Sequence, residues 1–139
     1  MDRPGSYLLF ISIDEPRELS IGRLGRCELH PGVYVYCGSA LNGVKARVGR
    51  HFRKEKKEHW HIDRLLAAGD LMFALMLYSS ERCECEMAKG LLQSGRFDRV
   101  IGGFGSSDCR CGGHLFYCDD LDVGAMRKVH ELLKVLAGP

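Results

Sequence analysis

Apolar residues along this chain gather into short runs separated by turn-forming residues. Three runs rich in aromatic and β-branched residues predict strands, and the last of them is apolar enough to be buried on both faces. These strands are residues 7–13, 32–38 and 71–80. Residues 19–29 alternate weakly around two glycines and predict a hairpin between the first two strands. Shorter runs at 99–101 and 114–118 predict two further strands around a loop rich in Gly, Ser and Cys.

Apolar residues three and four positions apart predict helices in the rest of the chain. Val44, Val48 and Phe52 form one stripe that should face the sheet, and Asn42 is suited to cap the start of this helix. Further helices should end near residues 69, 95 and 138. Hairpin-connected strands come first and strands interleaved with helices come later. The order predicts an α+β fold with a small, largely antiparallel or mixed sheet, flanked by helices and completed by C-terminal strands and a closing helix.

The length and composition indicate one soluble domain. A chain of 139 residues with 45% apolar content supports a single core, so we expect one domain over residues 1–139. No apolar run has the length of a membrane-spanning helix, and the N-terminal sequence is unlike a secretory leader. The seven cysteines are an odd number and lie in strand-like and helix-like segments, which is unlike a secreted disulfide scaffold. We therefore expect a cytoplasmic protein.

The basic residues are concentrated in one segment of the chain. Residues 45–57 contain seven Lys or Arg and one Glu, whereas the rest of the chain carries a small negative charge. Such a segment attracts a polyanion such as a nucleic acid. An ordinary solvated helix face can have the same composition, so the charge alone leaves both interpretations open.

Polar side chains are expected to converge where the second firm strand meets the following helix. Alternation along the strand places Tyr34, Tyr36 and Gly38 on one face. Arg47 and His51 are four residues apart and so lie on the same side of the helix. Taken one at a time, strand tyrosines are usually ordinary sheet residues, and charged helix residues are usually surface groups. The ordered set favours an active-site-like cluster.

Four short motifs follow one another along the chain. They are Gly5-Ser6-Tyr7, Tyr36-Cys37-Gly38-Ser39-Ala40, the segment ARVGRHFR that contains Arg47, and a strand followed by a helix that contains Glu86. In this order they resemble the GIY-YIG nuclease superfamily, and more closely its branch of stand-alone domains called DUF123. The resemblance implies a GIY-YIG-like core in which Tyr7 and Tyr36 lie side by side on neighbouring strands. Ser6 replaces the usual aliphatic residue of the first motif, and Tyr34 is the alternative to Tyr7.

The resemblance implies an endonuclease that hydrolyses phosphodiester bonds in DNA with Mg²⁺ or Mn²⁺. Candidate substrates are branched or damaged DNA, as in DNA repair, with DNA favoured over RNA. Glu86 would bind the metal ion, with Glu84 as second choice, and Arg47 would neutralise charge on the scissile phosphate. Tyr7 or Tyr36 would position or deprotonate the attacking water. The expected catalytic residues are Tyr7, Tyr36, Arg47, His51 and Glu86.

A second set of residues would hold the nucleic-acid backbone without reading its sequence. The expected members of this set are Gly38, Ser39, Lys45, Arg50, Arg53 and Lys54. Larger relatives join this fold to a targeting domain. A partner protein or self-association is therefore the candidate source of targeting for the shorter chain.

A loop rich in cysteine suggests a different kind of site. Cys109, Cys111 and His114 are thiolate and imidazole groups of the kind that bind Zn²⁺. Their spacing lacks the two separated ligand pairs of ordinary zinc modules, and free cysteines are commonly buried without a metal. Two alternatives to the nuclease therefore stay open. One is a non-catalytic nucleic-acid-binding module, and the other is a zinc-stabilised interaction domain.

Overall fold

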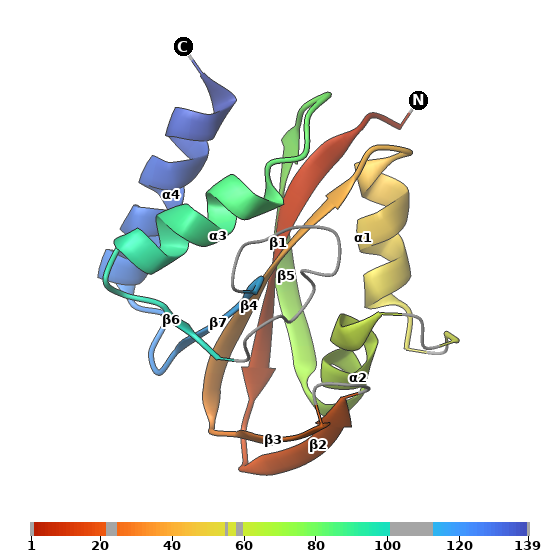
Figure 1. Cartoon of the computed structure of the whole chain (residues 1–139), viewed down its shortest axis with the longest axis vertical. Helices are drawn as coiled ribbons and strands as arrows, with labels where there is room; N and C mark the ends of the chain where they lie inside the picture. The colour runs from red at the N-terminus through yellow and green to blue at the C-terminus, as the bar shows by residue number, and fades with distance from the viewer. Residues whose placement is uncertain (1, 22–24, 55, 58–59, 101–112, 139) are drawn as a thin grey trace.

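A computed structural model of the chain describes residues 2–21, 25–54, 56–57, 60–100 and 113–138. This part of the chain has the expected α+β fold, with a five-stranded sheet, a two-stranded sheet and four helices (Figure 1). The strands are β1 Gly5–Ile13, β2 Arg17–Ile21, β3 Gly25–Leu29, β4 Gly32–Ala40, β5 Asp70–Tyr78, β6 Asp98–Arg99 and β7 Leu115–Cys118. The helices are α1 Val44–Phe52, α2 His61–Ala68, α3 Glu84–Gln93 and α4 Val123–Ala137.

The large sheet has the order β5-β1-β4-β7-β6, and every neighbouring pair in it is antiparallel. The central pair, β1 and β4, runs in register from Gly5 opposite Ala40 to Ile13 opposite Gly32. Tyr7 therefore lies opposite Gly38. The hairpin β2–β3 connects these two strands and projects beyond the sheet (Figure 1). The two tyrosine motifs thus lie on neighbouring strands, as expected.

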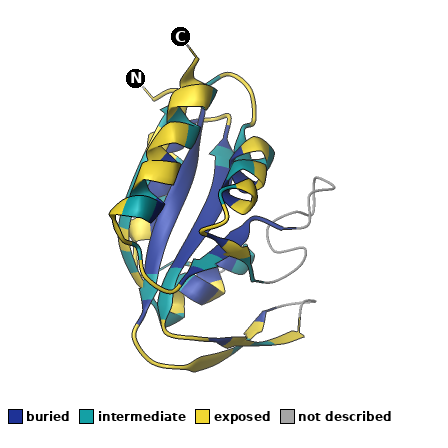
Figure 2. Cartoon of the chain, turned by 90° about the vertical axis from the view of Figure 1, so that its left-hand side faces the viewer, coloured by how far each residue is buried: buried dark blue, intermediate teal, exposed yellow. Residues whose placement is uncertain are grey.

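Each face of the sheet packs against its own pair of helices. Tyr7, Leu9 and Ile11 of β1 belong to a core shared with α1 and α2. The alternate residues Leu8 and Phe10 belong to a second core shared with α3 and α4. In Figure 1 the two helix pairs flank the central strands, and in Figure 2 the buried strands lie inside while the hairpin and the outer helix surfaces are exposed. The described helices include none with the length and apolar character required to cross a membrane.

Helix α1 is capped by a residue from the start of the chain. The carboxylate of Asp2 accepts hydrogen bonds from the backbone N–H groups of Lys45 (3.1 Å) and Ala46 (2.9 Å). The N-cap residue itself is Gly43, with φ 138°, and a Cβ atom there would lie 2.4 Å from the Asp2 carboxylate. The expectation that Asn42 caps this helix was wrong, because the orphan donors are satisfied from another segment.

The apolar stripe of α1 also differs from the prediction. Val44 and Val48 are buried, but the third buried residue is His51, whereas Phe52 is 47% exposed. Each helical residue turns by about 100°, so position 51 lies roughly 20° around the helix from Val44 and position 52 roughly 80°. The geometry therefore turns the imidazole toward the sheet and the phenyl ring toward solvent.

Strand β5 is less buried than its sequence suggested. It is the last strand of the five-stranded sheet and pairs only with β1 in the described part of the chain. Met72, Met76 and Tyr78 are exposed, so the prediction of burial on both faces was wrong. The reason is position, because an apolar composition does not distinguish a central strand from an edge strand. Strand β7 confirms the run predicted at 114–118, and β6 covers only part of the run at 99–101, whose last residue lies outside the described residues.

Candidate active site

The phenol of Tyr7 lies flat over the neighbouring strand because residue 38 is glycine. A Cβ atom at Gly38 would lie 2.4 Å from Cζ and 2.5 Å from the hydroxyl oxygen of Tyr7. Real side chains do not approach this closely, so any larger residue would displace the ring. The pairing of Tyr7 with Gly38 therefore fixes the position of one phenol, and Tyr36 lies beside it with ring centroids 6.4 Å apart.

Tyr7 is hydrogen-bonded to the buried histidine of α1. The hydroxyl oxygen of Tyr7 lies 2.8 Å from His51 Nε2. Burial raises the pKa of Tyr7 to about 12, so the phenol is protonated at neutral pH. Burial likewise lowers the pKa of His51 to about 4, although the Asp63 carboxylate acts in the opposite direction. The pair is therefore uncharged at neutral pH, with a ring nitrogen of His51 able to accept a proton.

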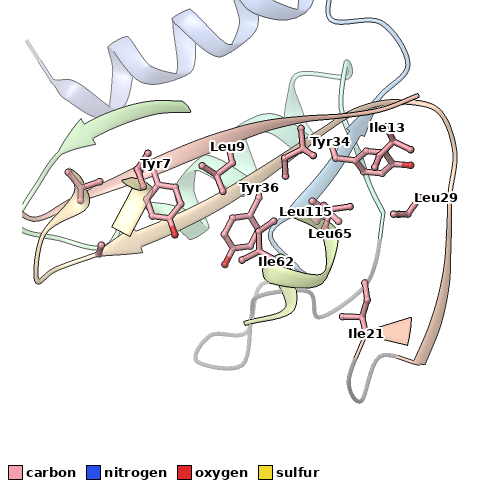
Figure 3. Packing of buried hydrophobic residues seen from close by; sticks show 14 residues of the cluster. Tyr7, Leu9, Ile13, Ile21, Leu29, Tyr34, Tyr36, Ile62, Leu65 and Leu115 are labelled. Atoms are coloured by element: carbon pink, nitrogen blue, oxygen red, sulfur yellow. The ribbon is translucent and has the colours of Figure 1, made fainter. Parts of the chain in front are cut away.

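Tyr36 is the second phenol of the same face. Burial raises its pKa, and the neighbouring Tyr7 adds to this effect. Figure 3 shows the side chains of Tyr7 and Tyr36 leaving the sheet in the same direction. Tyr34 belongs to the same buried face, but its hydroxyl donates to the carbonyl of His30 (2.7 Å) and its ring contacts Tyr117. Tyr7 is therefore the partner of Tyr36, and Tyr34 is an internal packing residue.

Arg47 lies beside these phenols. Its Nη1 donates to the backbone carbonyl of Ser39 (3.3 Å), and its Cζ lies 4.5 Å from the ring centroid of Trp60. Among the opposing effects on the pKa of Tyr7, the charge of Arg47 is the largest and lowers it. The guanidinium is thus held near the Tyr7 hydroxyl by a carbonyl and an indole ring.

Arg50 is engaged in a partly buried ion pair. Its guanidinium donates two hydrogen bonds to the carboxylate of Asp63, at 3.0 and 3.1 Å, and a third to the carbonyl of Lys57 (2.8 Å). It also stacks on Trp60 at 4.3 Å, and Asp63 accepts a hydrogen bond from the backbone N–H of Trp60. Arg50 is one of the residues expected to contact a nucleic-acid backbone, and in the structure its guanidinium holds Trp60 and the start of α2 against α1.

A chain of hydrogen bonds joins the first turn of α3 to the ends of β1 and β4. The backbone N–H of Cys83, the N-cap residue of α3, donates to Ser6 Oγ (2.9 Å), which lies 2.6 Å from Ser39 Oγ. Ser39 in turn donates to the carboxylate of Glu84. Ser6, the departure from the usual motif, therefore has a specific partner on the neighbouring strand. The chain holds the Glu84 carboxylate beside Ser39.

The carboxylate that lies near the phenols is Glu84. Glu86, the residue we expected to bind the metal ion, is exposed on α3 and is absent from the cavity lining. Two residues along a helix are about 200° apart, so Glu84 and Glu86 face nearly opposite directions. The carboxylate that lines the cavity is therefore Glu84, the second choice from the sequence, and not Glu86.

These side chains enclose one cavity of about 270 Å³. It is lined by Tyr7, Tyr36, Cys37, Gly38, Ser39, Leu41, Asn42, Arg47, Trp60, Arg82, Glu84 and His114. Six of the expected site residues thus meet in one place, and His51 reaches it through Tyr7; the six are Tyr7, Tyr36, Gly38, Ser39, Arg47 and His114. The cavity combines guanidinium groups that bind phosphate oxygens with one carboxylate.

The other residues that were expected to contact a nucleic-acid backbone lie elsewhere in the basic segment, residues 45–57. Lys45 is exposed in the first turn of α1, and Arg53 and Lys54 are exposed beyond its last turn. Arg53 and Lys54 line a second cavity on the other side of His51. Lys45, Arg53 and Lys54 therefore lie on helix α1 or just beyond its end, and none of them lines the 270 Å³ cavity.

Among the described residues, the donor set of the cavity suits a magnesium ion. Mg²⁺ is usually held by one or two carboxylates together with substrate phosphate and water, and Glu84 supplies such a carboxylate. The described residues contain no group of three His, Cys, Asp or Glu side chains that could hold a metal by themselves. Of the expected zinc ligands, Cys109 and Cys111 lie outside the described residues. His114 is buried, with Nε2 3.5 Å from the sulfur of Cys85.

Trp60 and Arg82 line the cavity but were not among the candidates from the sequence. Trp60 lies beneath two guanidinium groups. Trp60 is the only tryptophan of the chain and stands in the polar segment EHWHID, outside any apolar stripe. An aromatic residue without an apolar neighbourhood is a signal of a functional contact that could have been used.

The family comparison matches nearly the whole chain. A profile of the family described as "Domain of unknown function DUF123" matches residues 6–136. This range contains the Tyr7, Tyr36, Arg47 and Glu84 positions of the cavity. No curated protein and no solved structure matches the chain.

Proposed function

This chain belongs to the DUF123 family, and for this member we propose a GIY-YIG-type activity, the divalent-metal-dependent hydrolysis of phosphodiester bonds in DNA. One observation carries the proposal. A single cavity brings together the guanidinium of Arg47, the phenols of Tyr7 and Tyr36 and the carboxylate of Glu84. Metal-dependent hydrolysis of a phosphodiester uses charge neutralisation, a positioned nucleophile and a metal ligand, and this set offers one group for each.

Arg47 is the group that binds the scissile phosphate. Its charge is permanent, and its contacts with Ser39 and Trp60 hold the guanidinium at the cavity before substrate arrives. A preorganised cation does not have to reorganise as negative charge grows on the phosphate oxygens. Arg47 therefore stabilises the transition state more than the ground state.

Tyr7 positions the attacking water, and His51 supports it. The protonated phenol can take up a proton from the water only if it releases its own. The Nε2 atom of neutral His51, 2.8 Å away, is the acceptor for that phenolic proton. The proton thus moves from water to the Tyr7 oxygen as the Tyr7 proton moves to His51.

Glu84 is the residue that would hold the metal ion. Its carboxylate is oriented by Ser39 and shares the cavity with Arg47. When bound, Mg²⁺ or Mn²⁺ supplies charge stabilisation at the leaving oxygen. The metal ligand and the phosphate-binding guanidinium come from different faces of the fold, and the Ser6–Ser39 contact joins them.

The substrate class follows from the charge around the cavity. The basic segment of residues 45–57 suits a nucleic-acid backbone, and branched or damaged DNA is the proposed substrate. The seven cysteines of the chain, an odd number in segments unlike a secreted disulfide scaffold, suit the proposed setting, a reducing cytoplasm. A partner protein or self-association is proposed to supply targeting.

The experiment is a cleavage assay on a panel of labelled substrates. Duplex, nicked, flapped, four-way and single-stranded DNA and single-stranded RNA are each incubated with Mg²⁺, Mn²⁺ or EDTA. We expect metal-dependent cleavage of at least one DNA, lost in Arg47→Gln and retained in Lys89→Gln. The control removes the same charge from an exposed position on α3. Binding without cleavage in every condition would overturn the proposal and favour a non-catalytic nucleic-acid-binding module.

A further inference from the structure

A second, larger cavity lies on the other side of His51. Its volume is about 710 Å³, within the range of pockets that hold drug-sized ligands. It is formed where α1 and α2 end and β5 begins, and it shares no lining residue with the 270 Å³ cavity. The proposed nuclease chemistry does not use this cavity, so its chemistry can be considered separately.

The rim of the second cavity is basic. Arg17, Arg53 and Lys54 are exposed at this rim and form no ion pair with any described residue. Lys56 differs from these three residues because its ammonium already has partners. It donates to the backbone carbonyls of His51 (3.2 Å) and Arg53 at the end of α1. Two carboxylates also line the cavity, but Asp63 is neutralised by Arg50. Among the described lining residues only Asp70 opposes the three uncommitted cations, and the rim therefore favours an anionic ligand.

The wall of the same cavity offers an apolar, aromatic surface. Phe52 lines it and is 47% exposed, although a phenyl ring at the end of an amphipathic helix would normally be buried. Leu66 and Leu71 line the cavity beside it and are partly buried. An exposed aromatic ring flanked by uncommitted cations is the combination that binds a nucleotide, with the base on the ring and the phosphate on the cations.

His51 connects the second cavity to the candidate active site. The imidazole is 2% exposed, lines the second cavity and is bonded through Nε2 to Tyr7, which lines the first. Its other ring nitrogen, Nδ1, is buried and has no hydrogen-bond partner in the described part of the chain. Buried polar atoms almost always have a partner, so an unsatisfied one beside an open cavity points to a ligand or an ordered water there.

We propose that the second cavity binds an unpaired nucleotide that flanks the cleaved bond. Its base would stack on Phe52, and its phosphate would lie against Arg53, Lys54 and Arg17. A base inside a continuous duplex is stacked and paired, so only a single-stranded or flapped segment can enter the cavity. The proposal rests on the proposed function, which supplies a nucleic acid as the substrate, and narrows that substrate to DNA with an unpaired segment.

The test measures binding in EDTA, so that cleavage plays no part. The probes are a short single-stranded oligodeoxynucleotide carrying the fluorescent base 2-aminopurine and a blunt duplex of the same sequence. We expect the single strand to bind more tightly and its fluorescence to be quenched by stacking. Phe52→Ala should weaken single-strand binding roughly 10-fold and remove the quenching. Leu92→Ala, which truncates a similarly exposed apolar residue on α3, should change neither.

A double substitution tests the proposed contact between the phosphate and the cations at the rim of the cavity. Arg53→Gln combined with Lys54→Gln should weaken single-strand binding and lower its dependence on salt concentration, since fewer counterions are released. Equal affinity for the two probes, or quenching that survives Phe52→Ala in a folded protein, overturns the proposal. Binding that depends on Phe52 in a protein that cleaves no substrate supports the nucleotide site and rejects the nuclease. If neither probe binds, both the nucleotide site and the proposed nuclease function are rejected.

Discussion

The two faces of the central sheet differ in chemistry although the same strands form both. On the face covered by α3 and α4, Leu8 and Phe10 of β1 pack in a core built from apolar side chains. On the face covered by α1 and α2, Tyr7 alternates with them and meets a buried histidine. Successive residues of a strand point to opposite faces of the sheet, so the face to which a residue of β1 points decides its role. One face is apolar along most of its length, and the polar groups of the candidate site gather at one end of the sheet, where Tyr7 comes from the other face and Glu84 from helix α3.

The comparison predicts that substitutions on the two faces affect different properties. Changes on the apolar face should lower the free energy of unfolding and leave the activity of each folded molecule intact. Changes at the polar end should lower activity at a small cost in stability. The predictions below test this separation, in order of decreasing expected effect.

The largest effect is expected from Phe10→Ala on the apolar face. Phe10 is fully buried and stacks on Phe73, with ring centroids 4.4 Å apart. Removing a buried phenyl ring costs about 3–5 kcal/mol because a cavity is left behind. Urea unfolding measures this loss. Cleavage per folded molecule, measured at low temperature, should be unchanged, and a stability loss below about 1 kcal/mol would contradict the assignment of Phe10 to the core.

Tyr7→Phe tests the polar face. It removes one hydroxyl that is bonded to His51, so we expect cleavage to fall about 10²–10³-fold and stability to change by about 1 kcal/mol. Tyr34→Phe is the matched control, because Tyr34 lies on the same face but its hydroxyl bonds to a backbone carbonyl. The separation of roles fails if both variants lose activity equally.

The buried histidine predicts a dependence of stability on pH. The pKa of His51, lowered to about 4 from 6.5 in an unfolded chain, means that the unfolded state binds more protons between these values. Stability is therefore fully present above pH 6.5 and declines as the pH falls toward 4, by up to about 3 kcal/mol. Urea titrations of the wild type and His51→Gln measure it. Equal slopes in the two proteins would show that other groups, such as Asp63, cause the dependence.

Gly38→Ala should affect both properties. The added methyl group would lie 2.4 Å from the Tyr7 ring, so either the strand or the ring must move. We expect a loss of about 1–3 kcal/mol, as for other overpacked sites, together with reduced cleavage. Gly49→Ala on α1 is the control, because no heavy atom lies within 4 Å of the added Cβ. That variant should be at least as stable as the wild type, and a stable, active Gly38→Ala would refute the proposed close approach.

The smallest effect is expected at the start of α1. Asp2→Ala removes the carboxylate that caps this helix, and we expect the Tm to fall by about 2–4 °C with a small loss of activity through Arg47. Asp14→Ala, in the exposed turn after β1, provides the comparison. Equal changes in Tm would mean that the cap contributes nothing specific.

Periodicity predicted the fold because most of the elements are decided locally. Apolar runs rich in aromatic and β-branched residues identified β1 and β4, and the family resemblance implied that Tyr7 lies beside Tyr36, as the structure has it. The cap of α1 and the edge position of β5 depend on segments distant in the sequence, and local patterns carry no information about them. The burial of His51 in place of Phe52 could have been predicted from the sequence, because the turn of about 100° per residue brings position 51 closer than position 52 to the direction of Val44.

The candidate site was predicted less completely than the fold. The helix that carries the carboxylate was identified, but the sequence ERCECE offers acidic residues at alternate positions. The choice between Glu84 and Glu86 depends on where α3 begins, and that start is set by the contact of Cys83 with Ser6 across the fold. A tertiary hydrogen bond thus decides which side chain enters the cavity.

The most direct measurement compares Glu84→Gln with Glu86→Gln in the cleavage assay, using a substrate that the wild type cuts. The two changes remove the same charge from neighbouring positions of one helical turn, but only Glu84 lines the cavity with Arg47 and Tyr7. The account predicts that Glu84→Gln lowers metal-dependent cleavage on the order of 100-fold or more, and that Glu86→Gln stays close to the wild type. Full activity in Glu84→Gln, or a larger loss in Glu86→Gln, would contradict it.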